Sequence, residues 1–417
     1  MTQSPYRVRA VACDYAASED EIYAALKRAT APLTDSWDRL RRARTVGIKF
    51  NQDKEHKNRV YHRGHLQQLV DTKVARALLR LLRERTDAEL YCLDVSYYAM
   101  YGMAPLEETT TFAELLRDFD VPFIDGIQPP YAAVEVPGGG LMFDRYLLPG
   151  ALPEMDEFVS VALLKNHLFM GVTLSLKNLF GLMPGLSPAP HRTYYHHLVR
   201  MPYMLADLGK MVDPVLCVLD GLVGQAGKEW GYNGTHGPAQ ICNTLVAGNQ
   251  TIATDACATH LMGHDPQADW LTPPFHRDRN TLLVAAENGF GTVDLQEIDF
   301  QSEVEAPVGQ FYAEQTDSTA TNISWRRTTA EQALFYLDNR AHFVDKFAGQ
   351  YILLQDKEVR WHDTTSSLSI SRRILSGDKP EQAMWFKYVD PDEREGEHYD
   401  VYARTLEEVG ELEIAHW

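Results

Sequence analysis

The chain has few cysteines, and no two of them are close enough in sequence to form a paired motif. Cys-x-x-Cys pairs are typical of iron–sulfur clusters and zinc ribbons, so the spacing argues against both kinds of site. We expect reduced, buried thiols, a cytoplasmic location and no iron–sulfur cluster. The five cysteines are Cys13, Cys92, Cys217, Cys242 and Cys257.

Long hydrophobic runs and an excess of positive charge are also missing. No apolar stretch approaches the roughly 18 residues of a membrane span, and the first residues lack the pattern of a signal peptide. The 58 Asp and Glu outnumber the 40 Lys and Arg, for a net charge of −18. This balance disfavours nucleic acid and anionic membranes as partners. We expect neither, and a homo-oligomer is compatible with the composition.

Alternating strand-like and helix-like segments fill the first 300 residues. This order is typical of an α/β fold whose sheet is largely parallel. In such sheets, ligands bind beyond the carboxyl ends of the strands. The strands are expected at 6–12, 45–50, 89–95, 122–124, 158–164 and 215–220, and the helices at 18–29, 71–85, 112–117 and 254–262.

The 417 residues are too many for one ordinary hydrophobic core. We expect an α/β lobe over 1–150, a second α/β lobe over 151–305 and a cleft between them. A polar linker over 306–324 then leads to a small α+β domain over 325–417. In that domain, Thr329 and Gln332 form a capping-box pattern for a helix to Phe347, and the segment 349–362 predicts a hairpin turning at Asp356 and Lys357.

Polar side chains are concentrated in one otherwise apolar segment, residues 163–200. Lys and Arg are rarely buried without partners, because an unpaired buried charge is costly. We therefore expect these side chains to converge on the cleft. They are Lys165, His167, Lys177, Asn178, His191, Arg192, His196 and His197.

Three of these residues are the candidate catalytic groups. Lys177 lies among leucines and Phe180, and an apolar environment lowers the pKa of an amine, which makes it a candidate base or nucleophile. His167 follows an expected strand and could transfer a proton or bind a metal. Arg192 suits a bidentate grip on a carboxylate or phosphate. The alternatives are a hydrogen-bonded core histidine, and a lysine that reaches solvent or pairs with Asp220.

Further residues are candidates for binding. For a small anionic substrate we expect contacts from Lys49, Asn51, Lys165, Asn178 and His236. For a divalent transition metal we expect ligands from His167, His196 or His197, and Asp220. Neighbouring positions on a helix differ by about 100° in direction, so only one of the paired histidines can face a given site.

The glycine-rich segment 221–240 matches neither a P-loop nor a dinucleotide fingerprint, so no nucleotide cofactor is expected. His236, Gly237 and Pro238 in this segment could close over the cleft as a lid. Asp255 stands at the start of an expected helix, where capping alone would account for it.

These residues resemble the uncharacterised family known as domain of unknown function 362. The resemblance covers roughly residues 6 to 300. Many members of the family also carry a ferredoxin-type cluster segment, which this chain lacks. The matching parts are Lys49 to Asn51, Lys165 to His167, Thr173 to Gly181, Asp220 with Gly221, Gly237 with Pro238, and Asp255.

A fainter similarity in motif order links the chain to the nickel-pincer lactate racemase family. A histidine, a lysine, a Pro-Gly pair and a later histidine occur here as His167, Lys177, Pro184 with Gly185, and His196 or His197. Order alone does not imply that the chain holds a pincer cofactor.

The leading hypothesis is an enzyme that acts on a small anionic molecule by proton transfer or metal-assisted chemistry, as isomerases and lyases do. The alternatives are a redox or cluster-linked protein, and a non-catalytic binding or assembly protein that uses residues 325–417 as its contact surface. For a cleft enzyme, we expect the site to be independent of those C-terminal residues.

Overall fold

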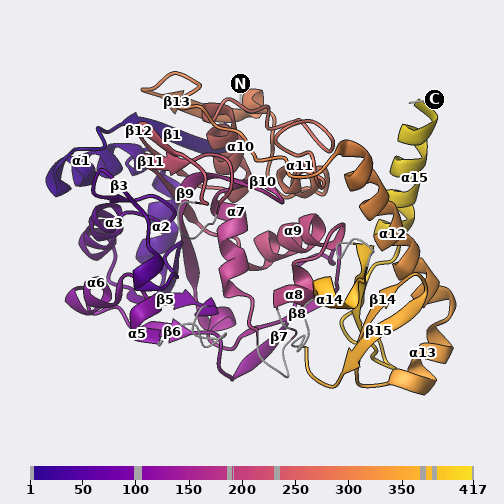
Figure 1. The fold of residues 1–417 in the computed structure, drawn as a ribbon. Coiled ribbons are helices and arrows are strands. Elements are labelled where there is room, and N and C mark those ends of the chain that lie inside the picture. Colours follow the sequence, from indigo (N-terminus) through magenta and orange to yellow (C-terminus); the bar gives the residue numbers. More distant parts are fainter. Residues whose placement is uncertain are drawn as a thin grey trace.

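The computed structural model describes residues 4–97, 106–185, 190, 192–229, 235–366, 372–377 and 383–415. Helices and strands alternate along the first 300 residues, and helices dominate the C-terminal part (Figure 1). The strands are β1 (Tyr6–Ala12), β2 (Thr45–Phe50), β3 (Tyr61–His62), β4 (His65–Leu66), β5 (Glu89–Asp94), β6 (Phe123–Asp125), β7 (Tyr131–Glu135), β8 (Arg145–Pro149), β9 (Glu157–His167), β10 (Gly171–Thr173), β11 (Leu216–Gln225), β12 (Ala239–Gly248), β13 (Ile298–Ser302), β14 (Tyr351–Gln355), β15 (Glu358–Asp363) and β16 (Trp385–Tyr388). The helices are α1 (Glu19–Thr30), α2 (Thr34–Arg42), α3 (Thr72–Arg85), α5 (Leu106–Thr109), α6 (Ala113–Asp118), α7 (Ser175–Asn178), α8 (Arg192–Tyr195), α9 (Arg200–Val212), α10 (Thr251–Leu261), α11 (Thr281–Glu287), α12 (Thr319–Asp338), α13 (Arg340–Phe347), α14 (Arg372–Leu375) and α15 (Asp400–Ala415), with short 3₁₀ turns η1 (His56–Asn58), η2 (Leu152–Glu154), η3 (Leu179–Leu182) and η4 (Leu295–Glu297).

A nine-stranded sheet organises residues 6–302, in the order β13-β1-β12-β11-β9-β2-β5-β6, with β10 paired to β9. The run β11-β9-β2-β5-β6 is parallel, and β12 joins it antiparallel. The predicted α/β class with a largely parallel sheet is therefore confirmed. The sheet is also continuous across the boundary predicted at residue 150, because β9 lies between β2 and β11.

Each face of the sheet is apolar, because successive side chains of a strand point to opposite faces. One face, with Val159 and Val161 of β9, packs against α1, α2 and α3. The other face, with Ala162 and Leu164 of β9, packs against α7, α9 and α10. The nearly continuous burial of β9 and β11 is what a strand covered on both faces requires.

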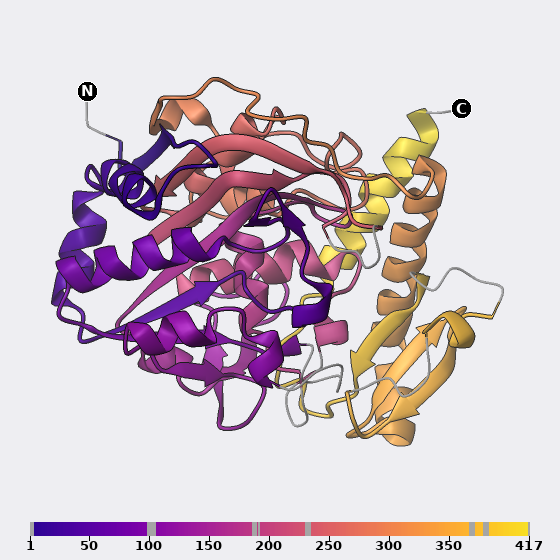
Figure 2. The same ribbon diagram turned by 60° about the vertical axis from the view of Figure 1, so that its left-hand side comes forward.

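The C-terminal part combines a three-stranded antiparallel sheet, in the order β15-β14-β16, with the helices α12, α13, α14 and α15. The predicted hairpin is confirmed: Asp356 and Lys357 form its turn, and both have a positive φ, as a tight two-residue turn requires. The helices α12 and α15 lie side by side in both views (Figure 1 and Figure 2). None of the helices in the described ranges is long and apolar enough to span a bilayer.

The helix predicted from Thr329 begins ten residues earlier. Ser318 is the N-cap of α12, since its hydroxyl accepts a hydrogen bond from the Thr321 amide. Thr329 and Gln332 are buried inside the helix, and the helical path changes at Asn339, where α13 follows. The last residues of the predicted linker are thus helical.

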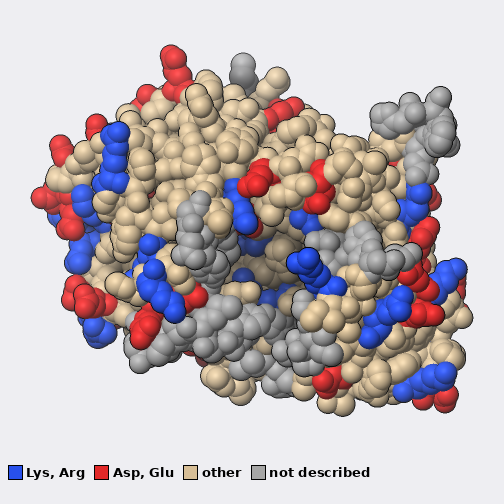
Figure 3. Space-filling model, viewed as in Figure 1, with Lys and Arg blue, Asp and Glu red and all other residues tan. Residues whose placement is uncertain are grey.

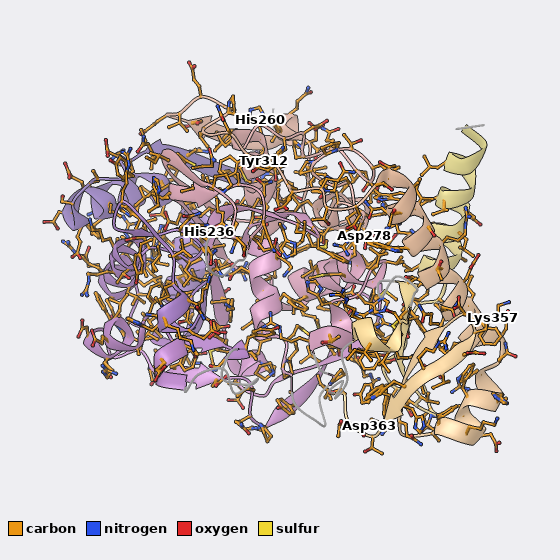
Figure 4. All side chains as sticks on the ribbon, in the orientation of Figure 1. His236, His260, Asp278, Tyr312, Lys357 and Asp363 are labelled. Carbon is orange, nitrogen blue, oxygen red and sulfur yellow. The ribbon has the colours of Figure 1, made fainter. Side chains whose placement is uncertain are left out.

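The C-terminal part also shares its core with the sheet domain. Asp278, labelled in Figure 4 beside α12, pairs with the buried Arg326 of that helix. Arg200 of α9 pairs with Glu397 at 2.8 Å, and both side chains are fully buried. A single apolar cluster runs from the sheet through α9 to β14 and β16.

Candidate active site

A cavity of about 390 Å³ lies at the carboxyl ends of β2, β5 and β9 and is closed on one side by α7 and α8. This is the place where open α/β sheets bind ligands. Its volume suits a small molecule. Figure 3 shows the hollow near the centre of the face in view, with blue Lys and Arg atoms in and around it.

Lys177 projects into this cavity from α7. Its Nζ lies 4.5 Å from the centre of the Phe180 ring, and among the described residues it has no hydrogen-bond acceptor and no ion-pair partner. Desolvation, together with the nearby Arg192, lowers the pKa of the amine to about 7. The sequence predicted a lowered pKa for the same physical reason, but the alternative pairing with Asp220 does not occur.

Asp255 holds the helix that carries Lys177. Its two carboxylate oxygens accept the backbone N–H groups of Ser175 at 2.9 Å and Leu176 at 2.8 Å, which are the first residues of α7. The cap of its own helix, α10, is instead Gln250. The sequence analysis therefore correctly gave Asp255 a capping role but assigned it to its own helix, α10, instead of α7. A capping contact between distant segments has no signal in the local sequence.

Replacing Asp255 with asparagine should destabilise this arrangement. An amide nitrogen cannot accept a hydrogen bond, so one of the two N–H groups of α7 would lose its acceptor, at a cost of about 1–3 kcal/mol. Chemical denaturation would measure the loss. The exposed His260 on the same helix supplies a control, since His260→Asn should change stability by less than about 0.5 kcal/mol. Equal stability of the two variants would contradict the capping role.

His167 ends β9 with its ring tautomer fixed by the backbone. Its Nδ1 accepts the N–H groups of Phe169 at 2.9 Å and Met170 at 3.1 Å. The proton of the neutral ring therefore sits on Nε2, which lies 3.5 Å from a carboxylate oxygen of Glu229. Desolvation, with Lys177 and Lys165 nearby, lowers the pKa of His167 well below its usual range. This ring can donate a hydrogen bond, but it has no free lone pair with which to act as a base.

Arg192 is the first residue of α8, and its guanidinium lies close to two aromatic rings. Its Cζ lies 5.0 Å from the centre of the Tyr97 ring and 4.8 Å from that of Phe180. Among the described residues it has no carboxylate partner. Two rings therefore orient its planar fork while its donors stay open to a ligand, which is the geometry of an anion anchor.

The predicted binding residues Lys165 and Lys49 have different hydrogen-bond and ion-pair partners. The Nζ of Lys165 bonds to the Gln68 carbonyl at 3.0 Å and to Oδ1 of Asn51 at 3.4 Å, and burial lowers its pKa to about 8. Lys49 instead forms a buried ion pair with Asp94 at 3.0 Å, so its charge is already compensated. The cavity is lined by Lys165, Asn51, Lys49 and Asp94, and Asn51 directly follows β2.

Asn178 also lines the cavity, but its amide nitrogen bonds to Lys49 O, Ser160 Oγ and Val161 O. These bonds tie α7 to the strands β2 and β9. Gly181, just beyond, packs against the Lys49 side chain, and a Cβ there would collide with it. We interpret both as residues that position the site.

A family model described as "Domain of unknown function (DUF362)" matches residues 46–260 of the chain. The chain belongs to the DUF362 family. The resemblance seen in the sequence is thus confirmed, and the matched range includes β2, β9, α7 and α8, which form the cavity.

Two more distant similarities accompany this match. A thylakoid-associated protein of Synechocystis sp. is 27% identical over 161 residues, which is 38% of this chain and 47% of that protein, so the match spans less than half of the relative's length. The lactate racemase apoprotein from Thermoanaerobacterium thermosaccharolyticum aligns with a TM-score of 0.37 at 13% identity, over 61% of this chain and 56% of that one. A structural likeness at this level supports no assignment of function.

Several predicted site residues of this DUF362 protein lie elsewhere. Asp220 is buried, accepts the N–H groups of Asp71 and Leu222, and does not line the cavity. His236, labelled in Figure 4, points its Nδ1 at the Gly237 carbonyl and is likewise not in the lining. His191 lies outside the described residues.

Of the paired histidines, only His196 lines the cavity. Its ring centre lies 6.2 Å from that of His167, while His197 is buried beside the Leu198 carbonyl. As predicted, only one of the two faces the cavity, although both histidines follow α8 rather than lying within a helix.

The predicted metal ligands do not form a metal site in the described part of the chain. Asp220 is not in the cavity, and Nε2 of a neutral His167 carries a proton rather than a lone pair. Metal-binding histidines usually show the reverse pattern, with Nδ1–H donating to an acceptor. No group of three or more His, Cys, Asp or Glu with suitable geometry occurs among the described residues. The donor set therefore does not fit a divalent metal.

The sequence analysis missed several lining residues, among them Glu229, Tyr97 and Arg372. Glu229 accepts the Leu168 N–H at 2.7 Å and faces His167. Tyr97 stacks on Arg192, and Arg372 enters from α14 of the C-terminal part. Glu229 could have been suspected as an acidic residue in the glycine-rich segment. No local sequence signal marks Arg372, which lies 180 positions beyond Arg192 in the sequence. Because Arg372 lines the cavity, the site is not independent of the C-terminal residues, contrary to the prediction.

Proposed function

We propose that this protein is an enzyme that binds a small carboxylate in the cavity and moves a proton on the carbon next to that carboxylate. The observation that carries the proposal is the Lys177 amine, which has no ion-pair partner among the described residues, faces the cavity and has a pKa of about 7. An amine with this pKa is largely neutral at slightly alkaline pH, and a base works best when its pKa is near the working pH.

Each neighbouring residue has a role that follows from its contacts. Arg192 holds the substrate carboxylate with its oriented fork. Neutral Lys177 takes a proton from the adjacent carbon, and the electron pair of the broken C–H bond moves into the carboxylate to give an enediolate. The Nε2–H of His167 and the ammonium of Lys165 supply donors for the oxygen on which charge develops. Return of the proton from Lys177 to the same carbon restores the carboxylate.

This role for His167 is narrower than the sequence suggested. A ring whose Nδ1 accepts two backbone N–H groups cannot receive a proton there without breaking both bonds. We therefore assign it hydrogen-bond donation, with Lys177 as the base. The reaction class remains that of an isomerase or a lyase, without a metal-assisted step.

Hydrogen exchange tests the proposal without knowledge of the net reaction. A panel of small 2-hydroxy, 2-oxo and 2-amino carboxylates would be incubated with the protein in D₂O and followed by ¹H NMR. Loss of the signal from the carbon next to the carboxylate is expected for at least one member of the panel. The exposed Lys346→Met variant is the matched control and should exchange like the unmodified protein.

The rate of exchange should depend on pH through Lys177. Its free amine is the reactive form, so the rate should rise between pH 6 and 8 with a midpoint near 7. Exchange that does not change over this range, or that falls as pH rises, would contradict an amine base with this pKa.

A further inference from the structure

We propose that the Lys177 amine also adds to small 2-oxo carboxylates and forms an imine with their carbonyl carbon. This inference goes beyond proton transfer, but it rests on the proposed function for the way in which Arg192 holds the ligand. In a 2-oxo carboxylate, the carbon next to the carboxylate is a carbonyl carbon and has no hydrogen. A neutral amine directed at that carbon has no proton to remove there, and it acts as a nucleophile instead.

The stem of Lys177 is fixed on both sides by its neighbours in α7. On one side, the carboxylate of Asp255 accepts the backbone N–H of Leu176 at 2.8 Å. On the other side, the amide nitrogen of Asn178 donates to the Val161 carbonyl of β9 at 3.2 Å. A short helix held in this way limits the positions that the lysine head can take. This favours covalent addition, because a nucleophile that is already positioned loses less entropy when it reacts.

The head of Lys177 is available to a ligand. Its Nζ lies 4.5 Å from the centre of the Phe180 ring, and nowhere in the described ranges does a carboxylate or carbonyl accept a hydrogen bond from it. Desolvation, with Arg192 nearby, lowers the pKa of the amine to about 7, so a large fraction is neutral at pH 7.5. Desolvation and a neighbouring cation are established ways of activating a lysine as a nucleophile.

The carboxylate anchor lies against the same aromatic ring as the amine. The Cζ of Arg192 is 4.8 Å from the centre of the Phe180 ring, and its charge is close enough to lower the pKa of Lys177. In a 2-oxo carboxylate the carboxylate and the carbonyl carbon are directly bonded, so the groups that contact them must be neighbours. A ligand held by Arg192 therefore has its carbonyl carbon near the amine, whereas a simple ketone lacks the group that would hold it there.

His196 can carry the protons that imine formation requires. Its ring lines the cavity and packs against Phe169 and Phe180, whose ring centres are 5.2 Å and 5.8 Å away. Desolvation, with Lys177 nearby, lowers the pKa of His196 well below its usual range, so the neutral ring has both a lone pair and an N–H. The Nδ1 of His167 accepts two backbone N–H groups, whereas the His196 ring has no hydrogen-bond partner among the residues described.

The proposed reaction needs no other reactant. The lone pair of Lys177 Nζ forms the N–C bond, and the π electrons of the carbonyl move to its oxygen. His196 takes one proton from the nitrogen and delivers it to that oxygen, which gives a carbinolamine. The second amine proton follows the same route as the C–O bond breaks, and the oxygen leaves as water. The products are one imine and one water, with no change in oxidation state.

Reduction with sodium borohydride tests the inference, because it converts an imine into a stable secondary amine. The unmodified protein would be mixed with pyruvate at pH 7.5, reduced, digested and mapped by mass spectrometry. Lys177 should gain the mass of pyruvate less one oxygen atom. We expect this label at about ten times or more the level at the exposed Lys346, since a positioned amine reacts as if at higher concentration. Label spread equally over exposed lysines would overturn the inference, and this result requires no variant.

Acetone is the matched probe without a carboxylate. In the unmodified protein, pyruvate should label Lys177 about tenfold or more strongly than acetone, because a carboxylate accepts charge-assisted hydrogen bonds from a guanidinium. Arg192→Gln should bring the ratio of pyruvate to acetone labelling close to one. The ratio is the readout because Arg192 also affects the pKa of Lys177, which changes both rates alike. Equal labelling by the two probes in the unmodified protein would overturn the role of the carboxylate anchor.

Three variants separate the nucleophile from the proton carrier. Lys177→Met should lose the selective label, whereas Lys346→Met should keep it. His196→Phe retains an aromatic ring beside Phe169 but has no ring nitrogen. It should slow labelling of Lys177 by about a hundredfold, the lower range for a positioned proton-transfer group. An unchanged rate in His196→Phe would overturn the role of His196.

The two proposals fail in different ways. If pyruvate labels Lys177 but no 2-hydroxy or 2-amino carboxylate exchanges its carbon-bound proton, the proton-transfer proposal fails and the imine assignment stands. If such exchange occurs but pyruvate does not label Lys177, the imine assignment fails and the base assignment stands.

Discussion

Replacing Lys177 with methionine is expected to reduce the rate of carbon-bound hydrogen exchange by about a thousandfold, which is the usual contribution of a positioned base. Methionine keeps the approximate length and the contact with Phe180 but has no amine. The NMR assay in D₂O measures the effect, with Lys346→Met as the control. Exchange that persists at more than a tenth of the original rate would show that another group abstracts the proton.

The same substitution should make the protein more stable. The pKa of Lys177 is about 7 in the folded protein and 10.5 in the reference state, so below pH 7 folding must hold a poorly solvated ammonium in the cavity. This penalty is fully present below pH 7 and disappears as pH rises through 10.5. After allowance for partial exposure, we expect Lys177→Met to gain about 1–2 kcal/mol at pH 6.

Denaturation at pH 6 and at pH 10 tests the sign of this effect. The gain at pH 6 should shrink at pH 10, because the lysine is then neutral in the folded protein and partly neutral in the unfolded one. A variant that is less stable than the original at pH 6 would mean that the ammonium makes a favourable contact. If Lys177→Met loses hydrogen exchange and gains stability, the lysine serves the reaction at the expense of stability.

The parts of the site that sequence could predict are those set by a single strand or helix. The boundaries expected for β1 and β2 match the structure, because β-branched runs bounded by polar residues are local signals. The position of Lys165, His167 and Asn51 at strand ends followed directly. The crowding of Lys177 by leucines and Phe180 was equally local and correctly implied desolvation.

What the sequence could not predict depends on contacts between distant segments. The α7 cap by Asp255 joins positions about 80 apart. The tautomer of His167 depends on how the chain turns after β9, where Phe169 and Met170 bring their amides back to the ring. Asp220 was predicted as a metal ligand and ends the strand expected at 215–220, yet β11 continues to Gln225 and places Asp220 within the sheet.

The C-terminal part was expected to be an appendage, but it contacts the site through α8. Tyr194, two residues after Arg192, donates a hydrogen bond to Glu395 at 2.7 Å. Glu397 accepts bonds from Arg200 and from Lys387, both at 2.8 Å. The position of the Arg192 anchor therefore depends on a buried network that crosses between the two parts of the chain.

Removing the charge of Glu397 should cost about 3–5 kcal/mol, because the variant Glu397→Gln leaves Arg200 buried without its counter-ion. The exposed Asp400→Asn, which breaks the surface pair with Arg404, is the control and should cost less than about 1 kcal/mol. Equilibrium unfolding in urea measures both. A small loss for Glu397→Gln would show that water or Glu395 compensates Arg200.

Lowering the pH should destabilise the unmodified protein for the same reason as Glu397→Gln, because protonation also removes the charge of Glu397. Burial raises the pKa of Glu397, but Arg200 and Lys387 outweigh it and lower the pKa to about 2. A lowered pKa adds stability above the reference value of 4.5, and that stability is lost as pH falls from there toward 2.

Because Tyr194 and Arg192 share α8, weakening of this network should loosen carboxylate binding before the sheet itself unfolds. Glu397→Gln should therefore weaken binding of the preferred carboxylate at pH 7.5, whereas Asp400→Asn should not.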